Sequence, residues 1–263
     1  MQDLLLLAIE ASLKAGKEIL KVYHSDDFDV KIKSDNSPLT LADQNAHNVI
    51  AEILQKSELP ILSEEGKNIP FEERKQWERY WLVDPLDGTK EFIKRNGEFT
   101  VNIALIENGT PVLGVIYVPV TKDLYFGDKE KGSYKTVNAD KDADIKMLTQ
   151  FAFKLPFFQG NEIYTVVGSK SHMNEETEAF IYKLKQEKGG IDFISKGSSL
   201  KICMVAEGVA DIYPRFGPTM EWDTAAGHAI ALYSGCKITQ QDEKTPLSYN
   251  KKELLNPWFI VRR

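Results

Sequence analysis

Two acidic side chains stand close together where an apolar segment of the chain is expected to turn. Residues 80–83 are a short run of β-favouring residues, and Asp84 and Asp87 follow with Pro85 between them. Proline removes a backbone donor, so this pattern predicts that strand pairing ends at Pro85 and that both carboxylates lie in the turn. Neighbouring carboxylates repel unless they share a proton or a cation, and Mg²⁺ prefers such oxygen ligands. The first hypothesis is therefore a site for a hard divalent cation.

Two further acids stand at the ends of predicted elements. Glu64 follows the apolar run 59–62, which is expected to form a strand, and Asp223 precedes the small apolar residues 224–230, which are expected to form a buried helix. Loops at strand ends can project ligands from a fixed sheet. A carboxylate at Asp223 would be the N-cap of its helix, whose first N–H groups can also bind phosphate. Each acid alone is more typical of a turn, a helix cap or a solvated face than of a metal ligand, so only their combination favours a metal site.

The elements that must position these acids begin with helices and an antiparallel sheet. Apolar residues recur at helical spacing over 4–23 and again over 40–54, which places Asp43 in the first turn of a helix. Two later runs, 99–107 and 112–118, are apolar and rich in β-branched residues, and Asn108-Gly109 between them is a hairpin signal. The segments 124–127 and 133–135 are expected to be further strands. They predict an antiparallel meander.

The rest of the chain is expected to alternate strands with helices, as α/β proteins do. The predicted strands lie near 164–168, 191–195, 210–213 and 258–261, and the predicted helices near 175–186, 198–207 and 222–233. The charged, irregular segment 138–158 separates this part from the first. The predicted domains are therefore 1–150, with most of the acids, and 151–263, with Asp223 and the substrate contacts.

Composition excludes several classes of protein. The 263 residues are 42% hydrophobic, enough for a full core, and a net charge of −6 argues against a polymeric nucleic acid as partner. Cys203 and Cys236 show no metal-binding or redox spacing, so both are expected to be reduced core thiols. The apolar run near the N-terminus contains Asp3 and is broken at Glu10, so neither a signal peptide nor a membrane span is expected. The predicted location is the cytoplasm.

Four segments together resemble the motifs of the inositol monophosphatase superfamily. DPLDGT at 84–89 is similar to the metal-binding motif of that superfamily, and WDTAAG at 222–227 is similar to its second motif. SEE at 63–65 fits the expected additional ligand, and TLAD at 40–43 fits the Thr-x-x-Asp pattern. The segments follow the family's order and cover nearly the whole chain. The resemblance implies a layered αβαβα sandwich of the inositol monophosphatase and fructose-1,6-bisphosphatase type, which combines α+β and α/β features.

The resemblance also implies a site with two or three Mg²⁺ ions. Its ligands would be Glu64, Asp84, Asp87, Asp223 and the backbone carbonyl oxygen of Leu86. Such ions stabilise the attacking and leaving oxygens in phosphate-ester hydrolysis. Thr89 and Asp43 would be the catalytic pair, because a threonine hydroxyl can donate to the carboxylate while it accepts a hydrogen bond from the attacking water.

Within the superfamily, residues 84–100 most resemble the 3′(2′),5′-bisphosphate nucleotidases of the CysQ type. Those enzymes remove the 3′-phosphate of adenosine 3′,5′-bisphosphate, a by-product of sulfate assimilation, to give AMP and phosphate. The segment GSSLK at 197–201 supports this subgroup, because its Lys201 would lie near the second phosphate. The resemblance also implies inhibition by Li⁺ and allows a loose peripheral association with the inner face of the cytoplasmic membrane.

The predicted substrate contacts combine the metal motifs with residues from the second half. They are Glu64, Leu86, Asp87, Gly88, Thr89, Ser198, Ser199, Lys201, Arg215 and Asp223. Arg215 could hold a phosphate through two parallel hydrogen bonds, and the N–H groups of Gly88 and Thr89 could hold the scissile phosphate if a helix starts there. Residues 170–172 would border the nucleotide. His228, in an apolar helix, is more typical of a core histidine than of a ligand.

Two other functions stay open from the sequence. An inositol or sugar monophosphatase is the runner-up, because the metal motifs do not discriminate between substrates. A non-catalytic nucleotide- or cation-sensing module is the third, although every expected ligand and both members of the Thr89–Asp43 pair are present. The sequence does not decide among adenosine bisphosphate, its sulfate-linked analogue and inositol phosphates, nor does it give the oligomeric state.

Overall fold

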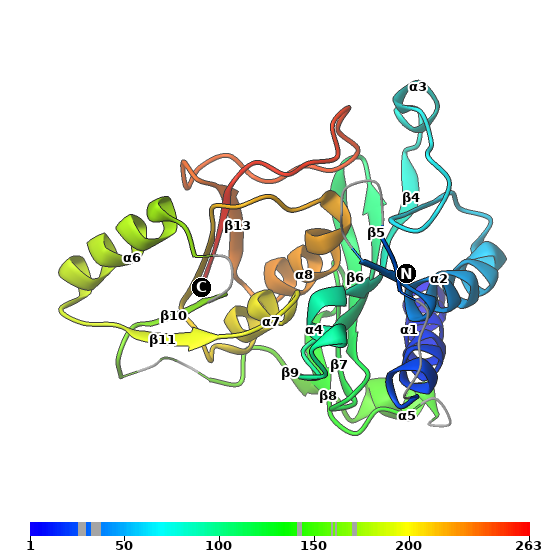
Figure 1. The fold of residues 1–263 in the computed structure, drawn as a ribbon, viewed down its shortest axis with the longest axis horizontal. Coiled ribbons are helices and arrows are strands. Elements are labelled where there is room, and N and C mark those ends of the chain that lie inside the picture. The colour runs from blue at the N-terminus through cyan, green and yellow to red at the C-terminus, as the bar shows by residue number, and fades with distance from the viewer. Residues whose placement is uncertain (26–29, 33–37, 141–143, 159, 161, 170–172) are drawn as a thin grey trace.

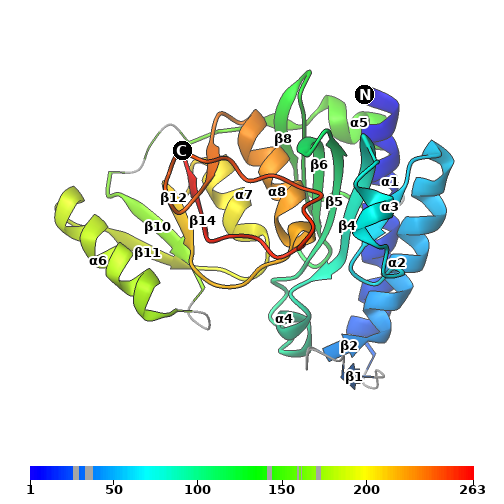
Figure 2. The same cartoon turned by 90° about the horizontal axis from the view of Figure 1, so that it is seen from above.

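The computed structural model describes residues 1–25, 30–32, 38–140, 144–158, 160, 162–169 and 173–263. Helices and strands stack in five layers (Figure 1). Seen from above, α6 (Glu175–Lys188) lies outside one sheet, and α7 (Leu200–Glu207) and α8 (Glu221–Tyr233) lie between that sheet and a larger one (Figure 2). Helices α1 (Gln2–Tyr23) and α2 (Leu41–Leu54) cover the far side. This arrangement confirms the predicted layered α/β sandwich.

The larger sheet has seven strands in sequence order. They are β3 (Ile61–Ser63), β4 (Arg79–Asp87), β5 (Thr100–Glu107), β6 (Thr110–Val118), β7 (Asp123–Asp128), β8 (Gly132–Thr136) and β9 (Phe153–Lys154). β3 is parallel to β4, and every later pair is antiparallel. Asn108 and Gly109 have φ angles of 50° and 74°, which a tight two-residue hairpin turn requires. The predicted meander and its hairpin are confirmed.

Helices α1 (Gln2–Tyr23) and α2 (Leu41–Leu54) cover one face of this sheet. Their apolar stripes, including Ile9, Ile19 and Ile50, pack with Trp81 and Val83 in one buried cluster. Burial of an apolar stripe on one side of a helix is what a 3.6-residue period produces. These helices hold the strand that delivers the first acids.

The middle layer consists of α7 (Leu200–Glu207) and α8 (Glu221–Tyr233), and both sheets pack on it. Toward the larger sheet, Ala226 and Ile230 join the cluster that contains Ile116. Helix α8 approaches β6 closely at Gly114. A Cβ atom added at Gly114 would lie 2.3 Å from the Ala226 carbonyl oxygen, so this approach requires glycine on the strand. The site-bearing end of α8 is therefore rigidly placed on the sheet.

The smaller sheet has five strands in the order β11-β10-β12-β14-β13. They are β10 (Thr165–Gly168), β11 (Asp192–Ser195), β12 (Ile212–Arg215), β13 (Lys237–Gln240) and β14 (Phe259–Arg262). β10 is parallel to β11 and β12, and β14 is antiparallel to β12 and β13. Helix α6 (Glu175–Lys188) closes the outer face, where Leu184 packs with Val166 and Ile260. The predicted alternation of strands and helices is confirmed.

Several short elements complete the fold. They are the antiparallel pair β1 (Val30–Ile32) and β2 (Pro38–Thr40), the 3₁₀ turn η1 (Gln55–Ser57), and the short helices α3 (Phe71–Arg74), α4 (Thr89–Ile93) and α5 (Ile145–Gln150). Among the described residues, no helix combines the length and apolarity that crossing a bilayer requires. Cys203 and Cys236 are buried free thiols, as predicted. The division of the chain near residue 150 stays a prediction.

Two local predictions are wrong. β4 does not end at Pro85: Asp84 pairs with Asn102 and Asp87 pairs with Thr100, so the strand passes the proline through a bulge. A bulge tolerates the missing donor because the extra residues are left out of the ladder. Asp223 is not the N-cap of α8 but its third residue.

Candidate active site

The predicted acids meet at one cavity of about 590 Å³ between the two halves of the chain. Glu64 directly follows β3, Asp84 and Asp87 flank the bulge of β4, and Asp223 lies in the first turn of α8. All four line the cavity together with Leu86. The bulge matters because it places two acids of one strand, three positions apart, on the same cavity wall.

Asp84 is the most buried of these acids, with 1% of its surface exposed. The Leu86 N–H donates to its Oδ1 at 3.1 Å. Loss of hydration raises the pKa of Asp84 well above its usual range, and the charges of Glu64 and Asp87 raise it further. The same carboxylate would be stabilised by a cation in the cavity.

Asp87 and Asp223 each have one oxygen held by a backbone N–H. The Ser199 N–H donates to Asp87 Oδ2 at 2.6 Å, and the Met220 N–H donates to Asp223 Oδ2 at 2.9 Å. Loss of hydration raises the pKa of both carboxyls; the charge of Lys201 opposes this at Asp87, whereas the charge of Asp87 adds to it at Asp223. The acids are thus oriented by the backbone without being neutralised by it.

No three acidic, histidine or cysteine side chains in the described part of the chain are already close enough together to form a metal cage. The donor set nevertheless fits Mg²⁺: it consists of carboxylate oxygens and the Leu86 backbone carbonyl oxygen, with no sulfur or nitrogen ligand among them.

Thr89 and Asp43 form a pair at the edge of the cavity. Thr89 Oγ1 lies 3.3 Å from Asp43 Oδ2 and 3.4 Å from the Leu86 carbonyl oxygen. Asp43, in the first turn of α2, is buried and does not line the cavity, whereas Thr89 does. Thr89 begins α4, and its N-cap Gly88 has a φ of 93° that favours glycine. The structure therefore brings the predicted catalytic pair together.

Positive charge lines the same cavity. Lys201 is buried, its Nζ donates to the Ser198 carbonyl oxygen at 2.6 Å, and it lies 5.6 Å from the centre of the Tyr213 ring. Burial lowers the pKa of Lys201 to about 8, although the Asp87 charge acts in the opposite direction. Arg215 also lines the cavity, where its Nη2 donates to the Pro218 carbonyl oxygen at 3.0 Å. Carboxylates and cations thus share one cavity.

Three other predictions have different outcomes. Ser199 lines the cavity, but its hydroxyl donates to Asn102 Oδ1 at 2.8 Å and is engaged in the interior. His228 is a core histidine as predicted, because its Nδ1 lies 2.9 Å from the Tyr249 hydroxyl and burial lowers its pKa to about 4. Residues 170–172 lie outside the described residues.

One residue that organises the site was missed from the sequence. Asn102 of β5 is buried, and it contacts Asp87 at 3.5 Å and the Ser199 hydroxyl at 2.8 Å. A polar residue between Val101 and Ile103, in a strand that is otherwise apolar from Val101 to Ile106, was the available signal, because buried polar groups need partners. Asn102 joins the β4 bulge to the start of α7.

Comparison with known proteins shows the family of this chain. The inositol monophosphatase family model matches residues 1–258. The 3′(2′),5′-bisphosphate nucleotidase CysQ of Salmonella typhimurium is 47% identical over 251 residues, which are 94% of either chain. The crystal structure of CysQ from Bacteroides thetaiotaomicron, a bacterial member of that family, superposes with a TM-score of 0.92 at 51% identity, covering 100% of this chain and 97% of that one.

A more distant structure shares the fold. An IMPase/NADP phosphatase complexed with Mg²⁺ and phosphate superposes with a TM-score of 0.71 at 18% identity, covering 95% of this chain and 86% of that one. At this identity the match concerns the arrangement of helices and strands alone.

Proposed function

This chain belongs to the inositol monophosphatase family, and from that premise we propose that it is a Mg²⁺-dependent 3′(2′),5′-bisphosphate nucleotidase. The reaction would convert adenosine 3′,5′-bisphosphate to AMP and phosphate. The observation that carries this proposal is the shared cavity, in which four carboxylates face a buried lysine. Relatives that are 47% and 46% identical to this chain and are named as such nucleotidases support the same substrate class.

The acid-lined wall of the cavity is the proposed metal site. Its ligands would be Glu64, Asp84, Asp87, Asp223 and the Leu86 carbonyl oxygen, for two or three Mg²⁺ ions. When bound, such ions offset the charge of the phosphate and stabilise the attacking and leaving oxygens. Leu86 is 1% exposed and offers only its carbonyl oxygen, so another apolar side chain of similar size should serve there.

Thr89 and Asp43 are proposed to orient the attacking water. If the Thr89 hydroxyl donates to Asp43 Oδ2, its oxygen lone pairs are free to accept a hydrogen bond from a water in the cavity. The proton lost by that water would pass through the Thr89 hydroxyl to Asp43 Oδ2. Asp43 does not line the cavity itself, so it depends on Thr89 to reach the water.

Lys201 and Arg215 are proposed to hold the second phosphate. A buried ammonium gains more from a dianionic partner than an exposed one, because less water screens the interaction. The N–H groups of Gly88 and Thr89, at the start of α4, are proposed to contact the scissile phosphate. A substrate with a single phosphate would leave Lys201 without an anionic ligand.

Substrate comparison tests this proposal directly. Phosphate release would be measured with Mg²⁺ on adenosine 3′,5′-bisphosphate, its sulfate-linked analogue and inositol 1-phosphate. The expected result is a clear preference for the nucleotides. Preference for inositol 1-phosphate would instead identify an inositol monophosphatase, and no turnover of any substrate would favour a non-catalytic sensing module.

Cellular properties complete the proposal. Li⁺ is expected to inhibit turnover in competition with the activating cation at the same acids. The cytoplasmic location and the loose association with a membrane surface are predictions that cell fractionation would test.

A further inference from the structure

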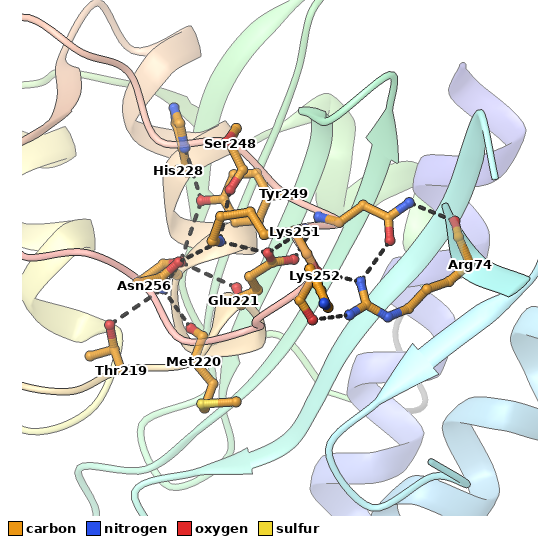
Figure 3. A network of polar contacts seen from close by, with 12 residues as sticks. Arg74, Thr219, Met220, Glu221, His228, Ser248, Tyr249, Lys251, Lys252 and Asn256 are labelled. Carbon is orange, nitrogen blue, oxygen red and sulfur yellow. Dashed lines mark hydrogen bonds and ion pairs between the residues drawn. The ribbon is translucent and has the colours of Figure 1, made fainter. Parts of the chain in front are cut away.

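The first turn of α8 is held by the loop of residues 248–256, far from it in sequence (Figure 3). The contact begins at the Thr219–Met220 peptide group. The Asn256 N–H donates to the Thr219 carbonyl oxygen at 2.8 Å, and at the other end of the same peptide the Met220 N–H donates to Asp223 Oδ2 at 2.9 Å. The loop therefore fixes the Thr219–Met220 peptide group, whose N–H orients the Asp223 carboxylate.

The Asn256 side chain holds the next peptide group. Its Nδ2 donates to the Met220 carbonyl oxygen at 2.7 Å and lies 3.0 Å from Thr224 Oγ1. Asn256 is 4% exposed, so water does not replace these contacts readily. One side chain thus bridges residues on both sides of Asp223 along the chain.

Glu221 fastens the same turn to the other end of the loop. Its carboxylate is completely buried and accepts hydrogen bonds from the Asn250 N–H at 2.7 Å, the Lys251 N–H at 3.0 Å and Lys251 Nζ at 2.6 Å. Arg74 supports the loop from behind, because its Nη1 and Nη2 donate to the carbonyl oxygens of Lys251 and Lys252 at 2.6 and 2.8 Å. The loop cannot shift without breaking several buried contacts.

We propose that Asn256 and Glu221 are positioning residues for Asp223, which set the direction of its carboxylate and thereby the affinity of the cavity for Mg²⁺. The inference rests on the proposed function only in taking Asp223 as a metal ligand. Partners that orient metal ligands from outside typically change metal affinity by about 10- to 100-fold when they are removed. Neither residue lines the cavity, so neither can bind the ion itself.

The test is calorimetric titration of the substrate-free protein with Mg²⁺ alone. Asn256→Ala should weaken binding roughly tenfold. Glu221→Gln should weaken it about threefold, because the amide oxygen can accept from only one of the two backbone N–H groups that the carboxylate holds, and the charge attraction to Lys251 is lost. The matched control is Tyr125→Phe, which removes a buried hydrogen bond to Glu207 away from the cavity and should leave binding unchanged. In turnover assays, the half-saturating Mg²⁺ concentration should rise in both variants while kcat at saturating Mg²⁺ stays near that of the wild type.

Each outcome decides the inference. Wild-type Mg²⁺ affinity in folded Asn256→Ala would overturn it, even if the melting temperature fell. If Asn256→Ala does not fold, Glu221→Gln decides in the same way. If both variants bind Mg²⁺ more weakly but the wild-type protein does not hydrolyse adenosine bisphosphate, the positioning role is supported and only the proposed substrate is refuted. A wild-type protein that binds no Mg²⁺ would overturn both.

Discussion

Glu221 and Asp223 stand two positions apart on the first turn of α8, and their surroundings are opposite. Glu221 is completely buried against Lys251 and two backbone N–H groups. Asp223 lines the cavity, receives one backbone N–H and faces the negative charges of Asp87 and Glu64. The protein itself neutralises the first carboxylate and leaves the second for a cation from solution. A structural acid and a functional acid differ here in their partners, not in their position along the chain.

The substitution with the strongest predicted consequence removes a carboxylate that faces the cavity. Asp84→Asn should lower turnover of adenosine bisphosphate roughly 10³-fold, because it removes one charge from the centre of the proposed metal site. Phosphate release at saturating Mg²⁺ measures the loss. Without divalent cations the variant should melt no lower than the wild type, since the amide no longer repels the neighbouring acids. Turnover within tenfold of the wild type would mean that Asp84 is not a ligand.

The second substitution removes the cation that neutralises the buried Glu221 carboxylate. Lys251→Met leaves Glu221 buried without its cation and should reduce the free energy of unfolding by about 2–3 kcal/mol, below the usual range for buried pairs because Lys251 is partly exposed. Urea unfolding measures the change. Lys14→Met, which breaks an exposed pair with Glu10, should cost about 0.5 kcal/mol or less. Equal losses in the two variants would contradict the distinction between these pairs.

A third substitution tests the role of Lys201 in binding the second phosphate and has a smaller predicted consequence. Lys201→Met should raise the KM for adenosine 3′,5′-bisphosphate about tenfold, equivalent to roughly 1.4 kcal/mol for a charge-assisted contact. The KM for adenosine 3′-monophosphate should change little, because that substrate lacks the second phosphate. Lys94→Met, at an exposed lysine just after α4, is the matched control. An equal rise in KM for both substrates would assign Lys201 to the scissile phosphate instead.

The smallest effect concerns pH. Burial lowers the pKa of His228 to about 4 in the folded chain, against an ordinary value of 6.5, so below that value the unfolded chain binds a proton that the folded chain does not. The contribution of neutral His228 to the free energy of unfolding is therefore complete above about pH 6.5. It falls as the pH falls, by about 1 kcal/mol between roughly pH 7 and 5.5. Urea unfolding at both pH values should show a smaller loss in His228→Gln. An unchanged loss would mean that other groups carry the pH dependence.

The features predicted correctly from the sequence are those whose signal is local. Strands β5 to β7 show clear apolar runs, with a hairpin dipeptide between β5 and β6, and the acids of the two motifs stand in short segments with recognisable spacing. The passage of β4 through Pro85 was not predictable in this way. Its ladder continues because Asn102 and Thr100 on the neighbouring strand accommodate a bulge, which the residues around Pro85 do not reveal.

The support of the site was missed for a related reason. Asn256 lies 36 positions from Met220, and Arg74 lies 176 positions from Asn250, so neither contact has a periodic or motif signal. Glu221 stands beside a recognised motif, but its sequence neighbours do not show whether it faces the cavity or Lys251. Partners distant in sequence decide that question, and only a three-dimensional arrangement contains them.

The shared middle layer of the sandwich has a consequence for synthesis. The face of the larger sheet that carries Leu82, Ile116 and Tyr125 is covered mainly by residues of α7 and α8. A ribosome adds residues from the N-terminus, so these apolar side chains emerge well before the helices that cover them. A nascent chain that stops before residue 200 therefore presents an uncovered apolar sheet, which is the kind of surface that chaperones bind and that aggregates. Synthesis of α7 and α8 therefore both completes the fold and covers the apolar face of the larger sheet.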